Sequence, residues 1–347
     1  MKINDVELGR CRPPFIIAEL SANHNGSLER ALEIVDAAAD AGAHAIKLQT
    51  YTADTMTIDK RGGEFMITDP ESLWTGYSLY QLYAEAHTPW EWHKPIFERA
   101  RERGLIAFSS PFDETAVDFL EELDVPAYKI ASFECIDLPL IRYVASTGKP
   151  MIISTGLATV SEIEAAVQAA RDGGCKDLAL LKCTSSYPST PENSNILTIP
   201  HMREMFGCEV GLSDHTLGIG AALAAVAHGA SIVEKHVTLR REDGGFDSAF
   251  SLEPSELKAL VEESERARQA LGAVRYGSSE AERESTIYRR SLYFVKDLAA
   301  GETVSSDSVR RIRPGYGLSP RYVDLVVGRK LKQAVSAGTP VGWQLLE

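Results

Sequence analysis

The segment GLSDHTLGIGAALAAVAHGASIVEKHVT, from Gly211 to Thr238, is the clearest guide to how the rest of the chain is organised. Two short apolar runs, Val210–Leu212 and Ser231–Val233, each end in polar residues and predict two strands. Between them, Ile219–Gly229 is rich in Ala and Leu and predicts a short buried helix that ends at Gly229. This order is typical of parallel strands joined by a right-handed crossover, which places the ends of both strands side by side.

Two histidines lie just past the ends of these strands. His215 and His236 would therefore meet on one face, flanked by Asp214 and Glu234. Two imidazoles in this arrangement could hold a divalent metal and leave coordination positions for substrate oxygens. A histidine in an apolar run is also a common structural residue, but the matched positions favour a metal site.

The alternation of strands and helices extends over the first 270 or so residues. Strands are predicted at Pro14–Ser21, His44–Tyr51, Leu105–Pro111, Ala127–Phe133, Pro150–Gly156, Leu178–Ser185, Glu209–His215 and Ser231–Thr238. The clearest helices are predicted at Leu28–Ala41, Trp90–Arg103, Glu114–Leu123, Val160–Asp172 and Pro254–Leu271. Eight such units favour a (β/α)₈ TIM barrel, whose functional groups collect at the carboxyl ends of the strands. A doubly wound open sheet is the alternative, but no Gly-rich fingerprint follows the first strand.

The chain divides into a barrel domain over 1–275, a small charged linker over 276–288 and a β-rich module over 289–347. Short strands in the module are predicted at Ser291–Val295, Thr303–Val304 and Arg310–Arg313. Within the barrel, the connection Thr52–Leu79 is unusually long and follows the second strand, so we interpret it as a substrate lid.

Composition narrows the class of protein. The 347 residues carry a formal net charge of −13, although 280–347 holds 11 Lys and Arg against 8 Asp and Glu. An acidic bulk argues against a nucleic-acid partner, and no apolar run is long enough for a membrane span. The five cysteines are scattered and odd in number, which favours the cytoplasm.

Polar side chains at the predicted strand ends indicate the chemistry. Lys47 and Lys129 lie in apolar runs, where a buried ammonium group needs an anionic partner. Five strands also supply Ser or Thr hydroxyls, among them Ser110, Ser154 and Ser213. Hydroxyl and ammonium groups together suit phosphate and carboxylate, so an anionic, phosphorylated substrate is predicted.

Several blocks of this sequence resemble the sialic acid synthases. They are AELSANHNGS, IKLQTY, FSSPFDETAVDFL, PAYKIASFE, ISTG, LLKCTSSYP, GLSDHT and EKHVT, while SLYFVKDLAAGE and RIRPGYG resemble the C-terminal antifreeze-like (SAF) domain of that family. The resemblance covers essentially the whole chain. Within the family, the segment Leu73–His93 is most similar to the pseudaminic acid synthases.

The resemblance implies a condensation of phosphoenolpyruvate with an open-chain N-acetylated sugar and water. His215 and His236 would hold Mn²⁺ or Mg²⁺ and thereby polarise the sugar aldehyde. It further implies that phosphoenolpyruvate is held by Lys47, Ser110, Lys129, Ser132, Ser154 and Ser213. Glu19, Gln49, Tyr187 and Asp247 would face the sugar, and Glu134 would lie near the metal and water. Arg313 would reach the acyl group of the sugar from the other subunit of a domain-swapped homodimer.

Alternatives differ in substrate or in chemistry. Ser185 stands where neuraminate synthases carry Asn, which favours a 6-deoxy, diacetamido sugar over N-acetylmannosamine; a neuraminate or legionaminic acid synthase remains the alternative. A Schiff-base aldolase would use Lys182 on the sixth strand and would not need the two histidines. A non-catalytic carbohydrate-binding protein would recognise sugar through its C-terminal module.

Overall fold

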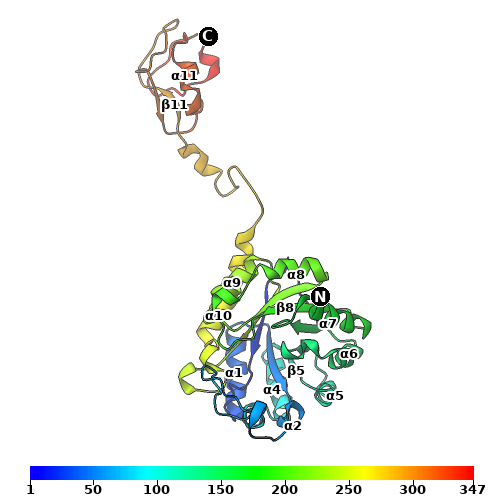
Figure 1. Cartoon of the computed structure of the whole chain (residues 1–347). Helices are drawn as coiled ribbons and strands as arrows, with labels where there is room; N and C mark the ends of the chain where they lie inside the picture. Colours follow the sequence, from blue (N-terminus) through cyan, green and yellow to red (C-terminus); the bar gives the residue numbers. More distant parts are fainter. The chain divides into compact units, whose positions relative to one another are not determined.

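The computed structural model describes residues 1–347, which form two compact units, Met1–Gly272 and Ala273–Glu347 (Figure 1). We call them the barrel unit and the C-terminal unit. The prediction of a linker over 276–288 stays a prediction; the short 3₁₀ helix η6 (Glu284–Tyr288) falls inside it. None of the helices is long and apolar enough to cross a lipid bilayer.

Eight parallel strands close the barrel unit, and this confirms the predicted TIM barrel. They are β3 (Phe15–Glu19), β4 (Ala45–Thr50), β5 (Ile106–Pro111), β6 (Tyr128–Ile130), β7 (Met151–Ser154), β8 (Leu178–Cys183), β9 (Glu209–Asp214) and β10 (Ile232–His236). Neighbours in sequence pair in order, and β10 pairs with β3 to complete the ring. All eight predicted strands are present, and each is shorter than its predicted range, by about one to four residues.

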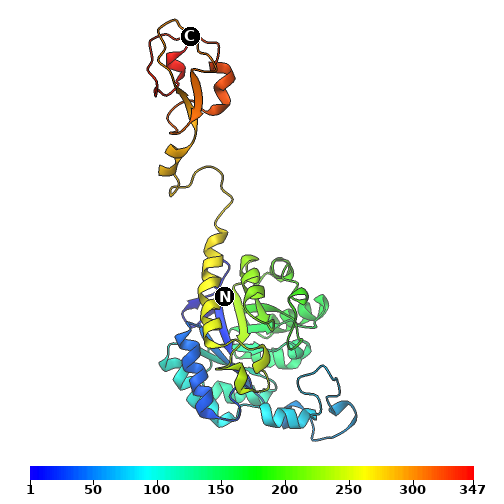
Figure 2. The same cartoon turned by 90° about the vertical axis from the view of Figure 1, so that its left-hand side faces the viewer.

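Helices form a layer around the strands in both views (Figures 1 and 2). They are α1 (Leu28–Asp40), α4 (Trp90–Glu102), α5 (Glu114–Glu122), α6 (Leu138–Ser146), α7 (Val160–Asp172), α8 (Thr198–Phe206), α9 (Gly220–Ala227) and α10 (Pro254–Leu271). Local capping explains why α1 begins at Leu28, as predicted: the side chain of the preceding Ser27 accepts a hydrogen bond from the Arg30 N–H. Burial of one apolar face per helix against the strands then makes a single continuous core.

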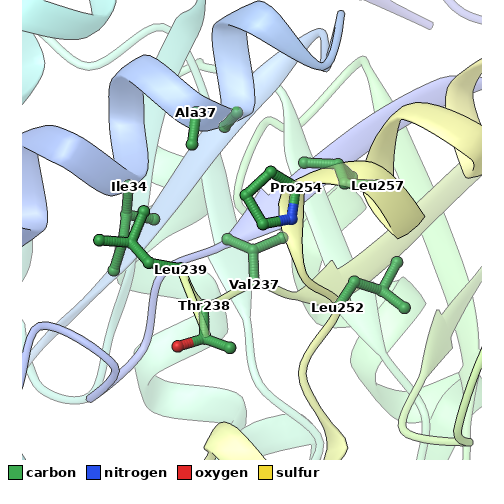
Figure 3. Close-up of a pocket in the computed structure, with 9 residues that line it drawn as sticks. Ile34, Ala37, Val237, Thr238, Leu239, Leu252, Pro254 and Leu257 are labelled. Atoms are coloured by element: carbon green, nitrogen blue, oxygen red, sulfur yellow. The ribbon is translucent and has the colours of Figure 1, made fainter. Parts of the chain in front are cut away.

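An antiparallel hairpin, β1 (Lys2–Ile3) and β2 (Val6–Glu7), precedes the barrel and was not predicted. Its residue Ile3, and Leu8 just after it, join the barrel core. Elsewhere in this unit, a cavity of about 10 Å³ lies between α1, α10 and the residues after β10 (Figure 3). Its lining is almost entirely apolar, so it is a gap in the packing rather than a polar binding site.

The connection between β4 and α3 (Leu79–Ala86) contains the long predicted loop. It holds the four-residue helix α2 (Ala53–Met56) and the 3₁₀ turn η1 (Gly63–Phe65), and its remainder extends from the barrel as a loop, in lighter blue in Figure 2. The structure therefore confirms a long excursion after the second barrel strand.

The C-terminal unit has its own small core, which includes Leu292, Phe294, Val326 and Leu331. Its sheet is the antiparallel pair β11 (Ser291–Phe294) and β12 (Val309–Ile312), followed by α11 (Val323–Val326). The prediction of a strand at Thr303–Val304 is wrong. Thr303 makes an isolated antiparallel bridge to Lys330, and backbone hydrogen bonds also join Glu302 to Leu331 and Val304 to Arg329, but no continuous strand forms.

Candidate active site

Four charged side chains meet inside the barrel, each from a different strand. Glu19 comes from β3, Lys47 from β4, Lys129 from β6 and Glu234 from β10, and all four are buried. Lys47 forms an ion pair with Glu19, and its Nζ lies 3.7 Å from Glu234 Oε1. Lys129 Nζ lies 3.9 Å from the same oxygen. The barrel thus brings two buried ammonium groups to one carboxylate at its centre.

Burial and ion pairing shift the pKa values of these four groups in different directions. Burial raises the pKa of Glu19 to about 7, although the charge of Lys47 opposes the shift. Burial would also raise the pKa of Glu234, but the charges of Lys129 and Lys47 outweigh it and lower that pKa. Burial lowers the pKa of Lys129. Glu19 is therefore a carboxyl that can exchange a proton near neutral pH, while Glu234 stays ionised.

Hydroxyl groups surround the two ammonium groups, as predicted for an anion site. Lys47 Nζ donates to Ser110 Oγ at 3.2 Å, and Lys129 Nζ donates to Ser154 Oγ at 2.6 Å. Ser213 Oγ donates to Glu234 Oε1 at 3.3 Å. These donors and cations are of the kind that bind phosphate and carboxylate groups.

Backbone approaches this cluster closely at Gly156, just after β7. The Gly156 N–H donates to Ser132 Oγ at 3.1 Å, and a Cβ atom at this position would lie 2.2 Å from Ser185 Oγ and 2.8 Å from Ser132 Oγ. Glycine is needed here because any side chain would displace both hydroxyls. The hydroxyl of Ser185 thus lies beside Ser132.

Glu134 lies on η2 (Phe133–Ile136), a 3₁₀ helix that begins directly after Ser132. Its Oε2 atom is buried and has no hydrogen-bond partner. Burial raises the pKa of Glu134 to about 7, against the opposing charge of Lys129. It is the second carboxyl of the barrel interior that is able to carry a proton near neutral pH.

The two histidines meet as the sequence predicted. The ring centroids of His215 and His236 are 5.3 Å apart. His215 Nδ1 lies 2.9 Å from the Thr184 carbonyl oxygen, and donation to it leaves Nε2 as a free acceptor. His236 Nδ1 is buried without a hydrogen-bond partner and lies 3.7 Å from Asp247 Oδ2. Burial, with His215 next in importance, holds the pKa of His236 well below its ordinary value, so that imidazole stays neutral.

Neutral imidazole is the form that binds a metal, and an unpartnered ring nitrogen beside a second imidazole fits a divalent cation. No group of three or more His, Cys, Asp or Glu side chains in the chain converges with the geometry of a metal centre. The protein would thus contribute two nitrogen ligands and leave the other positions to oxygens from substrate or water.

Aromatic rings form one wall beside the histidines. The ring of Tyr187 lies 4.4 Å from that of His215, and Trp74 of the long loop lies 5.9 Å from Tyr187. Trp74 Nε1 donates to the Phe246 carbonyl at 3.1 Å, and Phe250 lies 5.0 Å from His236. The loop after β4 therefore contacts the aromatic residues beside the histidines, and its role as a lid stays a prediction. Trp74, Phe246 and Phe250 were not predicted as site residues, because the sequence does not show which loops meet.

Polar groups complete the same side of the site. Ser21 Oγ donates to Asp247 Oδ2, and Gln49 Nε2 lies 3.3 Å from Ser21 Oγ. Asp247 therefore connects His236 to Ser21, and through Ser21 to Gln49. These groups can hydrogen-bond hydroxyl or amide groups of a sugar.

Cys183 is a further site residue that the sequence analysis did not single out. Its thiol lies 3.9 Å from His215 Nδ1 and 4.0 Å from Ser185 Oγ. Successive side chains on a strand face opposite sides, so Lys182 points away from the site. Its Nζ donates instead to the Cys183 carbonyl at 2.8 Å and to Thr184 Oγ1 at 3.2 Å. An aldolase mechanism through Lys182 would therefore lack its nucleophile in this pocket.

Arg313 is the one predicted site residue outside the barrel unit. It is exposed, directly after β12 of the C-terminal unit, and forms no side-chain hydrogen bond or ion pair within the chain. Its role in a site stays a prediction.

Comparison with known proteins identifies the family of this barrel protein. The chain belongs to the NeuB family, which matches residues 34–276, and residues 289–347 match the SAF domain. The resemblance to the sialic acid synthases is thereby confirmed.

The most similar relatives narrow the class. The chain is 44% identical to the pseudaminic acid synthase of Campylobacter jejuni, over 93% of this chain and 94% of that protein. It is 41% identical to the pseudaminic acid synthase of Helicobacter pylori, over 95% and 97%. The N-acetylneuraminic acid synthetase of Leptospira borgpetersenii, solved with citrate, superposes with a TM-score of 0.73 at 35% identity, over 83% of this chain and 95% of that one. The predicted likeness to pseudaminic acid synthases is confirmed.

Proposed function

We propose that this enzyme condenses phosphoenolpyruvate with 2,4-diacetamido-2,4,6-trideoxy-β-L-altropyranose and water, which gives pseudaminic acid and phosphate. The observation that supports this most directly is the meeting of Lys47 and Lys129, with their serine partners, beside His215 and His236 in one barrel. The names of the relatives at 41–44% identity support the same sugar product.

The anion site would hold phosphoenolpyruvate. Lys47 and Lys129 neutralise its phosphate and carboxylate, and the serine hydroxyls donate to their oxygens. The hydroxyl donors and acceptors concerned are Ser110, Ser132, Ser154 and Ser213. Binding in this buried cluster also keeps bulk water from the methylene carbon that forms the new bond.

The opposite side of the site would hold the open-chain sugar. Asp247, Gln49 and Ser21 supply hydrogen-bonding groups, while Tyr187 and Trp74 cover it. His215 and His236 would hold a divalent cation, Mn²⁺ or Mg²⁺, which when bound supplies Lewis-acid polarisation of the aldehyde. The two imidazoles thus fix where the reacting carbonyl group must lie.

The balance of the reaction assigns work to the two carboxyls. A carbon–carbon bond forms between the phosphoenolpyruvate methylene and the aldehyde carbon, water adds at C2, and the C–O bond to phosphate breaks. One proton must leave the water and one must reach the aldehyde oxygen. Glu19 and Glu134, each with a pKa of about 7, can accept or deliver these protons.

The test is phosphate release from phosphoenolpyruvate across a panel of amino sugars. We expect kcat/KM for the altro-configured 2,4-diacetamido sugar to exceed that for N-acetylmannosamine by at least about tenfold. N-acetylmannosamine has only one acetamido group, and a site that hydrogen-bonds the second amide discriminates strongly against a sugar that lacks it. The manno-configured diacetamido sugar, which leads to legionaminic acid, is the matched comparison. A tenfold preference for N-acetylmannosamine or for the manno-configured sugar would show that the proposed sugar substrate is wrong. The proposed type of reaction would still stand.

We further propose a homodimer in which the C-terminal unit of one chain covers the barrel of the other. Four apolar side chains that are each more than half exposed support a covered surface on the barrel. They are Phe133 and Ile136 on η2, Val160 at the start of the neighbouring α7, and Leu157 in the loop before α7. In such a dimer Arg313 would complete the sugar site of the partner. The five unpaired cysteines suit the reducing cytoplasm.

Complementation tests this arrangement. Arg313→Ala should lose most sugar affinity but keep the dimer, and His215→Ala should be inactive. Mixed under conditions of subunit exchange, confirmed with tagged chains, the two variants should regain part of the activity because one hybrid site contains both groups. If exchanged heterodimers stay as inactive as their parents, Arg313 does not act across the dimer.

A further inference from the structure

Strands β9 and β10 carry the site residues in alternating layers. Glu234 pairs in register with Ser213, and Lys235 with Asp214. Because side chains alternate along a strand, Glu234 and Ser213 face the barrel interior, whereas Lys235 and Asp214 face the helices outside. His236 and His215 follow them in sequence and face inward again. A buried ion pair therefore lies on the outer side of the barrel wall, directly beneath the two histidines.

The contacts of Lys235 are confined to one short segment. The side chain is fully buried, and its Nζ donates to Asp214 Oδ2 at 3.0 Å, to the Thr216 carbonyl at 2.5 Å and to the Gly218 carbonyl at 2.9 Å. Asp214 Oδ1 accepts from the Thr216 N–H at 2.9 Å. An ammonium group has three donors, so all of them are used to hold the turn that follows His215.

His215 is held from its other side as well. Its ring hydrogen-bonds the Thr184 carbonyl at 2.9 Å, and its own carbonyl accepts from the Ser189 N–H at 3.0 Å. The segment that follows β8 thus holds the ring and the carbonyl group of His215, while Lys235 and Asp214 hold the turn that follows it. Lys235 is also the residue before His236, so one side chain connects the backbones of both histidines.

We propose that the Lys235–Asp214 pair is a positioning device that sets the spacing of the two imidazoles for a divalent cation. The inference rests on the proposed function, in which these histidines are the metal ligands. Lys235 touches neither substrate nor cation in this arrangement. It acts through the 214–218 turn, as groups behind metal ligands commonly do.

The test uses the full-length variant Lys235→Met/Asp214→Asn. It removes both charges together, so no unpaired buried charge remains, and Asn can still accept from the Thr216 N–H. Mn²⁺ affinity is measured by titration of the metal-free protein, and phosphoenolpyruvate affinity and the melting temperature are measured alongside. We expect the Kd for Mn²⁺ to rise about tenfold or more, while the Kd for phosphoenolpyruvate stays within about twofold. The control is Lys149→Met/Glu121→Gln, which removes an ion pair with a 2.8 Å contact elsewhere in the barrel unit.

A second variant covers the case in which the first does not fold. Gly218 has φ +70° and open space around it, so Gly218→Ala strains the same turn without a clash; Gly104→Ala, at φ +79°, is its control. We expect Gly218→Ala to weaken Mn²⁺ binding and Gly104→Ala to leave it unchanged. If Mn²⁺ binding is equal in variants and controls, or if phosphoenolpyruvate binding falls to the same extent, the pair only stabilises the fold. If the wild-type protein itself binds no Mn²⁺, the proposed metal site is wrong and this inference with it.

Discussion

Replacing His236 by Ala is expected to lower turnover by about a thousandfold or more, since metal polarisation contributes several kcal/mol and about 1.4 kcal/mol is a factor of ten in rate. The physical reason is the loss of one of the two proposed metal ligands, a residue whose Nδ1 atom is buried and has no hydrogen-bond partner. His215→Ala should have an equal effect. The measurement is phosphate release in the presence of Mn²⁺, with circular dichroism to confirm that the barrel remains folded.

His201→Ala is the matched control, because His201 is an exposed histidine on α8 and should leave turnover unchanged. Chelation provides an independent check on the wild-type protein. Turnover should fall to the level of the histidine variants after exhaustive chelation and return on addition of Mn²⁺. Full activity in the chelated protein would show that the histidines serve another purpose.

Lys129→Ala is expected to raise the KM for phosphoenolpyruvate by roughly 10- to 150-fold, since a charge-assisted hydrogen bond contributes about 1.5–3 kcal/mol. The KM for the sugar should change far less, because Lys129 contacts Ser154 and Glu234, in the part of the site proposed to hold phosphoenolpyruvate. Steady-state kinetics with each substrate varied in turn measures the two effects separately.

Lys182→Ala is the control for this experiment. It removes a lysine from a neighbouring part of the barrel whose side chain faces away from the site, so both KM values should stay near those of the wild type. Equal effects of Lys129→Ala on both substrates would contradict the assignment of Lys129 to phosphoenolpyruvate. Complete loss of activity in Lys182→Ala, together with trapping of pyruvate by borohydride, would instead support the aldolase alternative.

Much of the barrel could be predicted from the sequence because its strands are fully buried and end abruptly. An apolar run such as Leu178–Cys183 followed by polar residues marks both the strand and the end that faces the site. The same logic predicts that His215 and His236 meet, because each follows the end of one of two neighbouring strands. Strand ends had already marked Lys47 and Lys129 as candidates for an anion site.

The remainder depends on contacts between segments far apart in the chain. Nothing local indicates that Trp74 hydrogen-bonds Phe246, or that Ser21 hydrogen-bonds Asp247. Cys183 could have been found by applying strand alternation on β8, since it lies on the face opposite to Lys182. Two β-branched residues at Thr303–Val304 favour extended backbone, but they pair with the chain only through an isolated bridge to Lys330, because local propensity does not determine how far a ladder extends.

The buried charge cluster also has a consequence for how the chain folds. Lys47 lies on the second barrel strand in chain order and Lys129 on the fourth. Glu234, which lies near both, is on the last strand. Without β10, Lys47 would keep its ion pair with Glu19, but Lys129 would lose its only carboxylate partner, and an unpaired buried charge is strongly unfavourable. A barrel that lacks β10 is therefore made less stable by the same residues that are proposed to bind the substrate. The same carboxylate that neutralises this charge cluster therefore also favours closure of the ring.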